Sequence, residues 1–311
     1  MKIAKNKFFI QLLLVVSFIF FSCEEKPKTN PTPEDLETAF AGTATISIDN
    51  EIAPYLQIPK LMFDSAFPDA KISLESISAR AAMSKLLNRS ARGIIVARDY
   101  LKDEDSLMKS FGVQEHDKFK VAEDALVLIV SPSFPLDTIN DAQLKDFFSK
   151  KETTLQKLYP SLSTEPSIHC LEPNSSVYAN ASTFLFSNKE PTKSIKFENS
   201  FEDVLKAVEK GDAIGITYLS AVALLPNRCK MLKIGFTDTS GYVSPKPVHQ
   251  SYIVMRKYPY IVNWYCYQLE TRRNFIWSFF TYLSREGKAQ RTFLERGIVP
   301  AHAKFELILQ D

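Results

Sequence analysis

Histidine and cysteine are the side chains best suited to bind a metal or to act as nucleophiles, and in this chain they are few and scattered. The four histidines lack the HxxxH or HExxH spacing of a zinc site: His116, His169, His249 and His302. Cys170, Cys229 and Cys266 also lack metal-site spacing, and three cysteines allow at most one disulfide, so we expect buried apolar thiols. The chain has no GxSxG motif and no P-loop. We therefore expect no metal, no cofactor and no enzymatic activity.

The fourth cysteine, Cys23, follows a segment with the layout of a bacterial export signal. Residues 1–22 begin with lysines, continue with an apolar run over 8–21 and end at Ser22. The apolar run is shorter than the ~20 residues that span a bilayer. A small residue directly before a cysteine resembles the lipobox, where a signal peptidase cleaves and the new N-terminal cysteine is acylated. We expect a signal peptide over 1–22 and a lipid on Cys23; an ordinary cleaved signal or an uncleaved anchor is the alternative.

The charge of the mature chain gives no electrostatic reason to expect a nucleic-acid partner. Lys2, Lys5 and Lys7 belong to the signal, so the 38 basic residues of the whole chain become 35, against 36 acidic ones. The resulting net charge of −1 leaves no global basic surface for nucleic acid or for anionic lipid. Residues 24–38 are rich in charge and proline and cannot bury enough apolar surface to fold. We therefore expect a flexible tether over residues 23–41.

Hydrophobic periodicity predicts alternating strands and helices in the rest of the chain. Between residues 43 and 97 the pattern is strand, helix, strand, helix and strand, which favours a parallel α/β sheet. A second α/β unit is expected from Ala125 to Leu219. His249–Met255 is predicted to be a strand, and Asn274–Glu295 one long helix whose aromatic residues belong to the core.

Three groups of segments carry a family resemblance. Residues 124–150 combine an apolar strand, two prolines and the sequence TINDAQLKDFFSK, and residues 211–219 read GDAIGITYL. The C-terminal part contains Tyr258-Pro259, LSREGKAQ at 283–290 and RGIVPA at 296–301. In this order and spacing the segments resemble the PstS-like phosphate-binding proteins of ABC uptake systems, which have the type 2 periplasmic binding protein fold.

The resemblance implies an α/β fold of two lobes with a ligand cleft between them. Each lobe would be a mixed, mainly parallel sheet flanked by helices. The first lobe would comprise residues 42–122 and 247–311, and the second residues 123–246. Helix N-termini that face the cleft would offer unpaired backbone N–H groups to an anion.

The family's anion-binding loops map onto seven candidate ligand-binding residues in this sequence: Asn50, Ser76, Ser78, Arg98, Asn174, Ser175 and Ser176. Asp49 and Glu51 flank the first of them and would repel an anion unless they turn away, and capping of the first helix by Asp49 or Asn50 is the expected alternative. The serines of the second loop, Ser76 and Ser78, are either ligands or helix caps.

Arg98 is the leading candidate for contact with an anion, because a guanidinium favours a fully charged oxyanion, whereas an acceptor carboxylate favours a protonated one. The alternative is a salt bridge with a neighbour such as Asp99 or Asp103. The last loop departs from the family pattern: Leu171–Val177 keeps serine but lacks the arginine, glycines and threonine. Glycine lets a backbone approach a ligand closely, so this loss puts tight phosphate binding in doubt.

The resemblance implies a bacterial envelope lipoprotein that faces the periplasm or the cell surface and captures phosphate or a related oxyanion. Its partners would be that anion, an ABC permease or other envelope protein, and the membrane through Cys23. The alternative is a binding-protein fold repurposed as an envelope sensor or a protein-interaction module. A third class, an enzyme, has no clustered catalytic motif to support it.

Overall fold

The computed structural model describes residues 37–113, 115–225 and 227–302, and all of these except Glu37 belong to one compact unit, Thr38–Asp311. The predicted signal peptide and Cys23 lie outside the described residues, as does most of the predicted tether. Within the described ranges, no helix is both long enough and apolar enough to cross a bilayer.

The first part of the fold is a parallel sheet with strand order β2-β1-β3, formed as the sequence pattern predicts. Its strands alternate with helices along the chain: β1 (Gly42–Asp49), α2 (Ala53–Ala66), β2 (Ala70–Ile77), α3 (Ala79–Leu87), β3 (Gly93–Val96) and α4 (Lys102–Ser110). β3 is buried throughout, which is typical of an inner parallel strand. The carboxyl ends of these parallel strands share one edge of the sheet, where ligands of α/β folds bind.

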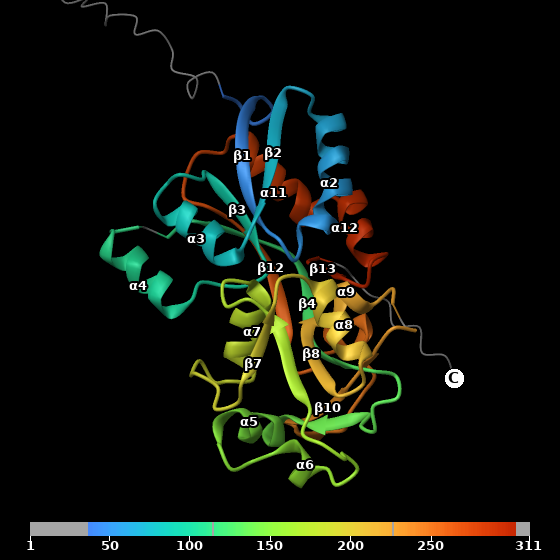
Figure 1. Cartoon of the computed structure of the whole chain (residues 1–311). Coiled ribbons are helices and arrows are strands. Elements are labelled where there is room, and N and C mark those ends of the chain that lie inside the picture. Colours follow the sequence, from blue (N-terminus) through green and yellow to red (C-terminus); the bar gives the residue numbers. More distant parts are fainter. Residues whose placement is uncertain (1–36, 114, 226, 303–311) are drawn as a thin grey trace, which may run out of the picture. The chain divides into compact units, whose positions relative to one another are not determined.

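Two long strands connect this first lobe with the second. β4 (Asp117–Val130) pairs antiparallel with β12 (Ile261–Gln268) over its first half, and its last residues, from Leu126 on, pair with β8 (Ala213–Tyr218). Figure 1 shows β4 and β12 running from the β1–β3 part into the part that contains β8. The predicted lobe boundary at residues 122 and 123 falls inside β4, and the boundaries stay a prediction.

The second lobe repeats the alternation of strands and helices around the parallel strands β8-β6-β7. Its elements are β5 (Thr138–Asn140), α5 (Asp141–Ser149), α6 (Leu155–Leu158), β6 (Ser167–Leu171), α7 (Ser176–Phe184), β7 (Ile195–Glu198), α8 (Phe201–Glu209), β8, α9 (Leu219–Val222), β9 (Lys230–Met231), β10 (Lys233–Asp238) and β11 (Gly241–Val243). β5, β10 and β11 form a separate small sheet. The predicted two-lobe α/β fold is therefore confirmed.

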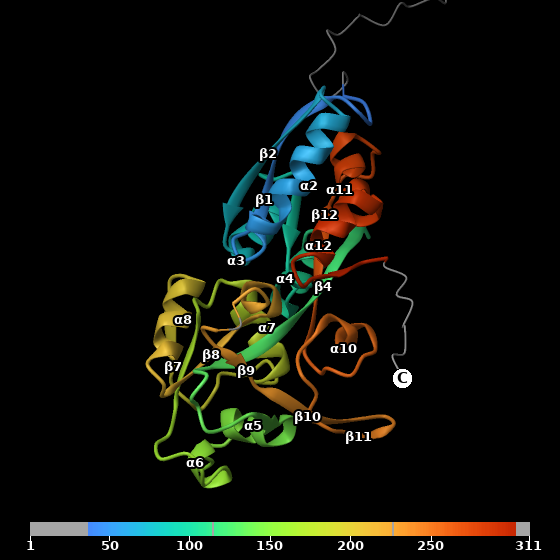
Figure 2. The same cartoon turned by 90° about the vertical axis from the view of Figure 1, so that its right-hand side faces the viewer.

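The C-terminal part returns to the first lobe and corrects two predictions. The predicted strand at His249–Met255 is the short helix α10 (Gln250–Val254), which the His249 side chain caps. The predicted long helix is two helices, α11 (Phe275–Arg285) and α12 (Gly287–Leu294), because Glu286 between them has an extended backbone and caps α12; the short strand β13 (Val299–Pro300) then pairs with β4. Figure 2 shows α2, α11 and α12 on one side of the sheet.

One hydrophobic core runs through both lobes and includes the three cysteines. Cys170, Cys229 and Cys266 are free and buried, which confirms the interpretation of these residues as apolar thiols. Phe275, Phe279 and Phe280 of α11 are fully buried, as predicted for the aromatic stripe. A smaller cluster lies beneath α3.

Candidate functional site

The candidate site lies where the carboxyl ends of β1, β2 and β3 meet the loop after β6. Among the contacts that join the two sides, Arg80 N donates to the Asn174 carbonyl at 3.1 Å, and Asn180 Nδ2 donates to the Ala97 carbonyl at 2.7 Å. Another is a hydrogen bond from Ser176 Oγ to Glu51 Oε2 at 3.3 Å. Loops far apart in the sequence are thus brought to one place, which is the arrangement expected of a cleft between two lobes.

Two serines of the candidate set cap helices, and the other two donate to side chains of the first loop. Ser78 caps α3 by accepting from Ala81 N at 3.4 Å, and Ser175 caps α7 by accepting from Tyr178 N at 3.1 Å. Ser76 Oγ donates to Asn50 Oδ1 at 2.7 Å, so these two exposed side chains form a pair across β1 and β2. Ser176 is fully buried.

Asp49 does not cap the first helix, so that prediction was wrong. The N-cap of α2 is Ile52, which has no side-chain hydrogen bond to the helix. Asp49 is fully buried, and its Oδ2 instead accepts from Ala97 N at 3.1 Å, at the end of the neighbouring strand β3. The Asp49 carboxylate therefore satisfies a buried backbone group with one oxygen, while its Oδ1 accepts from Glu51 N at 3.5 Å.

Glu51 also lies at the site, although it is not among the seven candidate residues. Burial, then the negative charge of Asp49, raises the pKa of Glu51 to about 10. This direction favours the protonated form of Glu51, in which the carboxyl proton is shared with the neighbouring Asp49 side chain. The only sequence signal was its position directly before a helix start, beside a second acidic residue.

Arg98 is buried in an ion pair, as the alternative reading of this residue allowed, but with a different partner. Its two terminal nitrogens donate to Glu104 at 2.7 and 2.8 Å, and Nη1 also donates to the Asp99 carbonyl at 2.9 Å. Asp103 pairs with Arg80 instead. The terminal nitrogens of Arg98 are therefore committed to the protein itself, while its Nε has no acceptor among the described residues.

Two residues outside the predicted set complete the site. Asn180 of α7 and Tyr218 at the end of β8 are both buried, and Asn180 Nδ2 donates to Tyr218 Oη at 2.8 Å. Tyr218 Oη in turn lies 3.4 Å from the Ala97 carbonyl, to which it donates. Tyr218 is the last residue of β8, whose sequence is AIGITY. The apolar pattern of this strand predicted a core position for Tyr218 and gave no sign that it lies at the site.

The site offers hydrogen-bond donors and neutral carboxyl chemistry but no obvious place for a metal. Among residues 37–302, apart from the two undescribed positions, no group of three or more histidine, cysteine, aspartate or glutamate side chains is arranged to hold an ion. Hydroxyl, amide and backbone N–H groups around a neutral acid are suited to holding a small polar solute.

Comparison with solved structures shows the same fold at low sequence identity. A putative phosphate ABC transporter substrate-binding protein from Clostridium perfringens, solved with bound phosphate, has a TM-score of 0.64 and 15% identity over 83% of this chain and 99% of the other. An ABC-type phosphate transport receptor from Vibrio cholerae has a TM-score of 0.64 and 15% identity, over 83% of this chain and 100% of the other. The reduced regulatory domain of OxyR2 from Vibrio vulnificus has a TM-score of 0.50 and 12% identity, over 79% of this chain and 95% of the other.

A search of curated proteins finds no match. The family model described as the PBP superfamily domain matches residues 33–272, which is most of the chain. The match runs from before β1 to just after β12, so it includes the connecting strands and all seven candidate residues but not α11, α12 and β13. The chain therefore belongs to the PBP superfamily.

Proposed function

We propose that this protein is an extracytoplasmic solute-binding lipoprotein that captures phosphate or a related oxyanion between its lobes for an ABC uptake system. The observation that carries the proposal is the hydrogen bond between Ser176 of the second lobe and the Glu51 carboxyl of the first, beside the N-terminus of α7. A ligand held at this point would contact both lobes and favour their closure. Solved relatives of the fold that are named for phosphate transport support this ligand class.

The acidic residues of the first loop are compatible with an anion. Asp49 is turned to the backbone of β3, and Glu51, with its raised pKa, is neutral at physiological pH. On ligand binding the Ser176 hydroxyl would turn from Glu51 to the oxyanion, and the first backbone N–H groups of α7 would add further donors. Because Arg98 is held by Glu104, the site favours a singly charged oxyanion, such as dihydrogen phosphate, over a doubly charged one.

Thermal melting of the full chain in detergent tests this function directly. Phosphate, sulfate, molybdate and organic phosphates would each be added at millimolar concentration. A ligand at one hundred times its Kd stabilises a fold by about 2.7 kcal/mol, and for a chain of this size each kcal/mol raises Tm by about 2–4 °C. A rise with phosphate supports the proposal, and an unchanged Tm with every anion would refute it.

The second candidate is a binding-protein fold used as an envelope sensor or protein-interaction module. It is favoured by the commitment of Arg98 to Glu104, which removes the one guanidinium of the predicted anion set from ligand contact. The similarity to a regulatory domain shows that this fold is not confined to transport proteins. This candidate expects no anion effect on Tm and a specific envelope protein that copurifies with the chain.

A further inference from the structure

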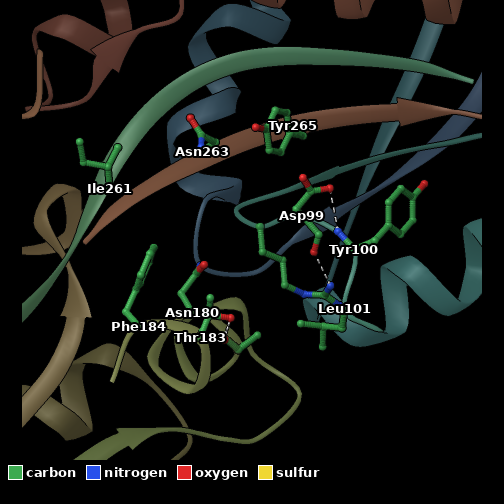
Figure 3. Close-up of a pocket in the computed structure, with 11 residues that line it drawn as sticks. Asp99, Tyr100, Leu101, Asn180, Thr183, Phe184, Ile261, Asn263 and Tyr265 are labelled. Carbon is green, nitrogen blue, oxygen red and sulfur yellow. Dashed lines mark hydrogen bonds between the residues drawn. The ribbon is translucent and has the colours of Figure 1, made fainter. Parts of the chain in front are cut away.

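The two connecting strands have a rear face, opposite the cleft between the lobes. Figure 3 shows the cavity of about 300 Å³ that belongs to the cleft and that Asn263 and Tyr265 of β12 line. Because side chains alternate along a strand, Val262 and Trp264 point to the other face, where they are buried. Asp124 of β4 is paired directly with Val262 and therefore shares this rear face.

Asp124 lies where β4 changes its pairing partner. Up to Ala125 the strand pairs with β12, and from Leu126 on it pairs with β8 of the second lobe. Ser220 of α9, in the second lobe, donates its backbone N–H to Asp124 Oδ1 at 3.2 Å. A rotation of the lobes about the connecting strands has to bend the chain near this point, so Asp124 is placed at the hinge.

Three buried polar atoms on this rear face have no hydrogen-bond partner within the described part of the chain: Asp124 Oδ2, Ser220 Oγ and Trp264 Nε1. Asp124 and Trp264 are fully buried, and Ser220 is 4% exposed. A buried polar group without a partner costs free energy. The stability of the fold therefore gives no reason to keep a carboxyl group at this position.

The Asp124 carboxyl group can be protonated or ionised under physiological conditions. Burial raises its pKa to about 6, while the hydrogen bonds from Ser220 and from Ala125 N lower it. Above this pKa, Asp124 carries a buried charge although its Oδ2 has no donor. Below this pKa, Oδ2 carries a proton that Ser220 Oγ can accept. Protonation would thus complete a contact between a connecting strand and the second lobe.

The first lobe covers Asp124 with Tyr55 of α2. Burial and the negative charge of Asp124 raise the pKa of Tyr55, whereas Ser220 and Arg296 lower it. The Tyr55 ring lies 5.7 Å from the Trp264 ring, and the Arg296 guanidinium lies over its face at 5.9 Å. Tyr55 of the first lobe and Ser220 of the second thus enclose the carboxyl group from two sides. Water can reach it when these two sides move apart.

The ionisable groups around α10 are engaged elsewhere. Arg256, just after this helix, pairs with Glu123, which points to the opposite face of β4 from Asp124. Tyr258 donates to the Leu126 carbonyl and Tyr260 donates to Asp141. Burial, and no neighbouring charge of a described residue, therefore sets the protonation of Asp124.

We propose that Asp124 and Ser220 form a pH-sensitive latch at the hinge, in which the protonated carboxyl group favours the arrangement of lobes described here and the ionised group favours their separation. The protonated group holds α9 against β4 by donating to Ser220 Oγ. The ionised group needs water, which enters when α2 and α9 move apart. The latch acts without a ligand and does not depend on which solute the cleft binds.

Hydrogen exchange resolved to single amides, in the full chain in detergent without solute, tests the latch. Arg80 N donates to the Asn174 carbonyl of the other lobe, so its protection reports contact between the lobes. Ala82 N donates to the Ser78 carbonyl within α3 and is the internal control. After correction for intrinsic exchange, Arg80 protection should fall about tenfold from pH 5 to pH 7.5, because the Asp124 pKa rises from 3.8 to about 6 on burial. Ala82 protection should not change.

Two matched variants assign the effect to Asp124. Asp124→Asn removes the charge and keeps an oxygen acceptor for Ser220 N, so its Arg80 protection should be independent of pH; Asp69→Asn, at an exposed position, should behave as the wild type. Circular dichroism melts establish that both fold. A constant Arg80 protection in the wild type, or an equal fall at Ala82, overturns the latch even if Asp124→Asn does not fold. A pH effect that persists in folded Asp124→Asn also overturns it, whatever phosphate does.

Discussion

Ser176 Oγ lies 3.3 Å from Glu51 Oε2, and this hydrogen bond joins the first turn of a helix in one lobe to a loop of the other, 125 residues away in the sequence. The carboxyl group involved is kept neutral by burial and by Asp49. The contact places the Glu51 carboxyl group beside the N-terminus of α7. The stability of the fold is therefore linked to the protonation of Glu51.

The Glu51→Gln substitution should stabilise the protein above neutral pH. Glu51 has a pKa of about 10 in the folded state against 4.5 as an ordinary side chain, so the folded state holds a proton that the unfolded chain releases. The stability from this group is complete below pH 4.5 and is lost as pH rises towards 10. Glutamine has no proton to lose, so urea unfolding at pH 8 should show a gain on the order of 1–3 kcal/mol.

The control for this prediction is Glu172→Gln, which makes the same change at an exposed position. It should leave both the stability and its pH dependence as in the wild type. If Glu51→Gln also leaves the pH dependence between 5 and 9 unaltered, then Glu51 does not carry the raised pKa.

Removal of Arg98 alone should be more harmful than simultaneous neutralisation of its partner. Arg98→Met leaves the buried Glu104 carboxylate without its bidentate donor, with only the partly exposed Arg80 at 2.8 Å as a cationic partner, and should cost about 3–5 kcal/mol. The double variant Arg98→Met with Glu104→Gln keeps an acceptor for Leu101 N, which donates to Glu104 at 2.9 Å, and removes the buried negative charge. Urea denaturation of the single and double variants should show recovery, whereas additive losses would argue against a buried pair.

Replacement of Asn180 should destabilise the protein, because the Asn180 side chain donates hydrogen bonds to groups of both lobes. Asn180→Ala leaves the buried Ala97 carbonyl and Tyr218 Oη without this donor, at a cost of about 1–3 kcal/mol. Asn199→Ala, at an exposed position, is the matched control and should change the unfolding free energy by less than about 0.5 kcal/mol. Equal effects of the two substitutions in chemical denaturation would show that Asn180 does not hold the lobes together.

Gly215 should resist substitution for reasons of packing. A Cβ at this position in β8 would lie 2.8 Å from Ile129 Cγ1 and from Val204 Cγ1, so Gly215→Ala should cost about 1–3 kcal/mol through overpacking. At Gly287, the first residue of α12, a Cβ would meet no heavy atom within 4 Å. Gly287→Ala should therefore be neutral or slightly stabilising in thermal melts, and a harmless Gly215→Ala would contradict the packing of β8.

The sequence alone predicted the α/β alternation well, because buried strands such as Gly93–Val96 and capped helices such as α7 are local patterns. It missed β12, although Asn263 and Tyr265 alternate there with buried residues in the way typical of a strand. The sequence also could not show that Arg98 would form its ion pair with Glu104, because that ion pair depends on how α4 packs after β3. The neutral state of Glu51 arises only when two distant loops bury it together.

The central claim, capture of an oxyanion between the lobes at Glu51 and Ser176, is tested most directly by calorimetric titration of phosphate into the wild type and the Ser176→Ala variant. The account predicts saturable binding of one phosphate per chain in the wild type and a loss of affinity of about tenfold in the variant, because one hydrogen-bond donor of the second lobe is removed. Wild-type binding that the variant retains in full, or no saturable heat in either protein, would contradict it.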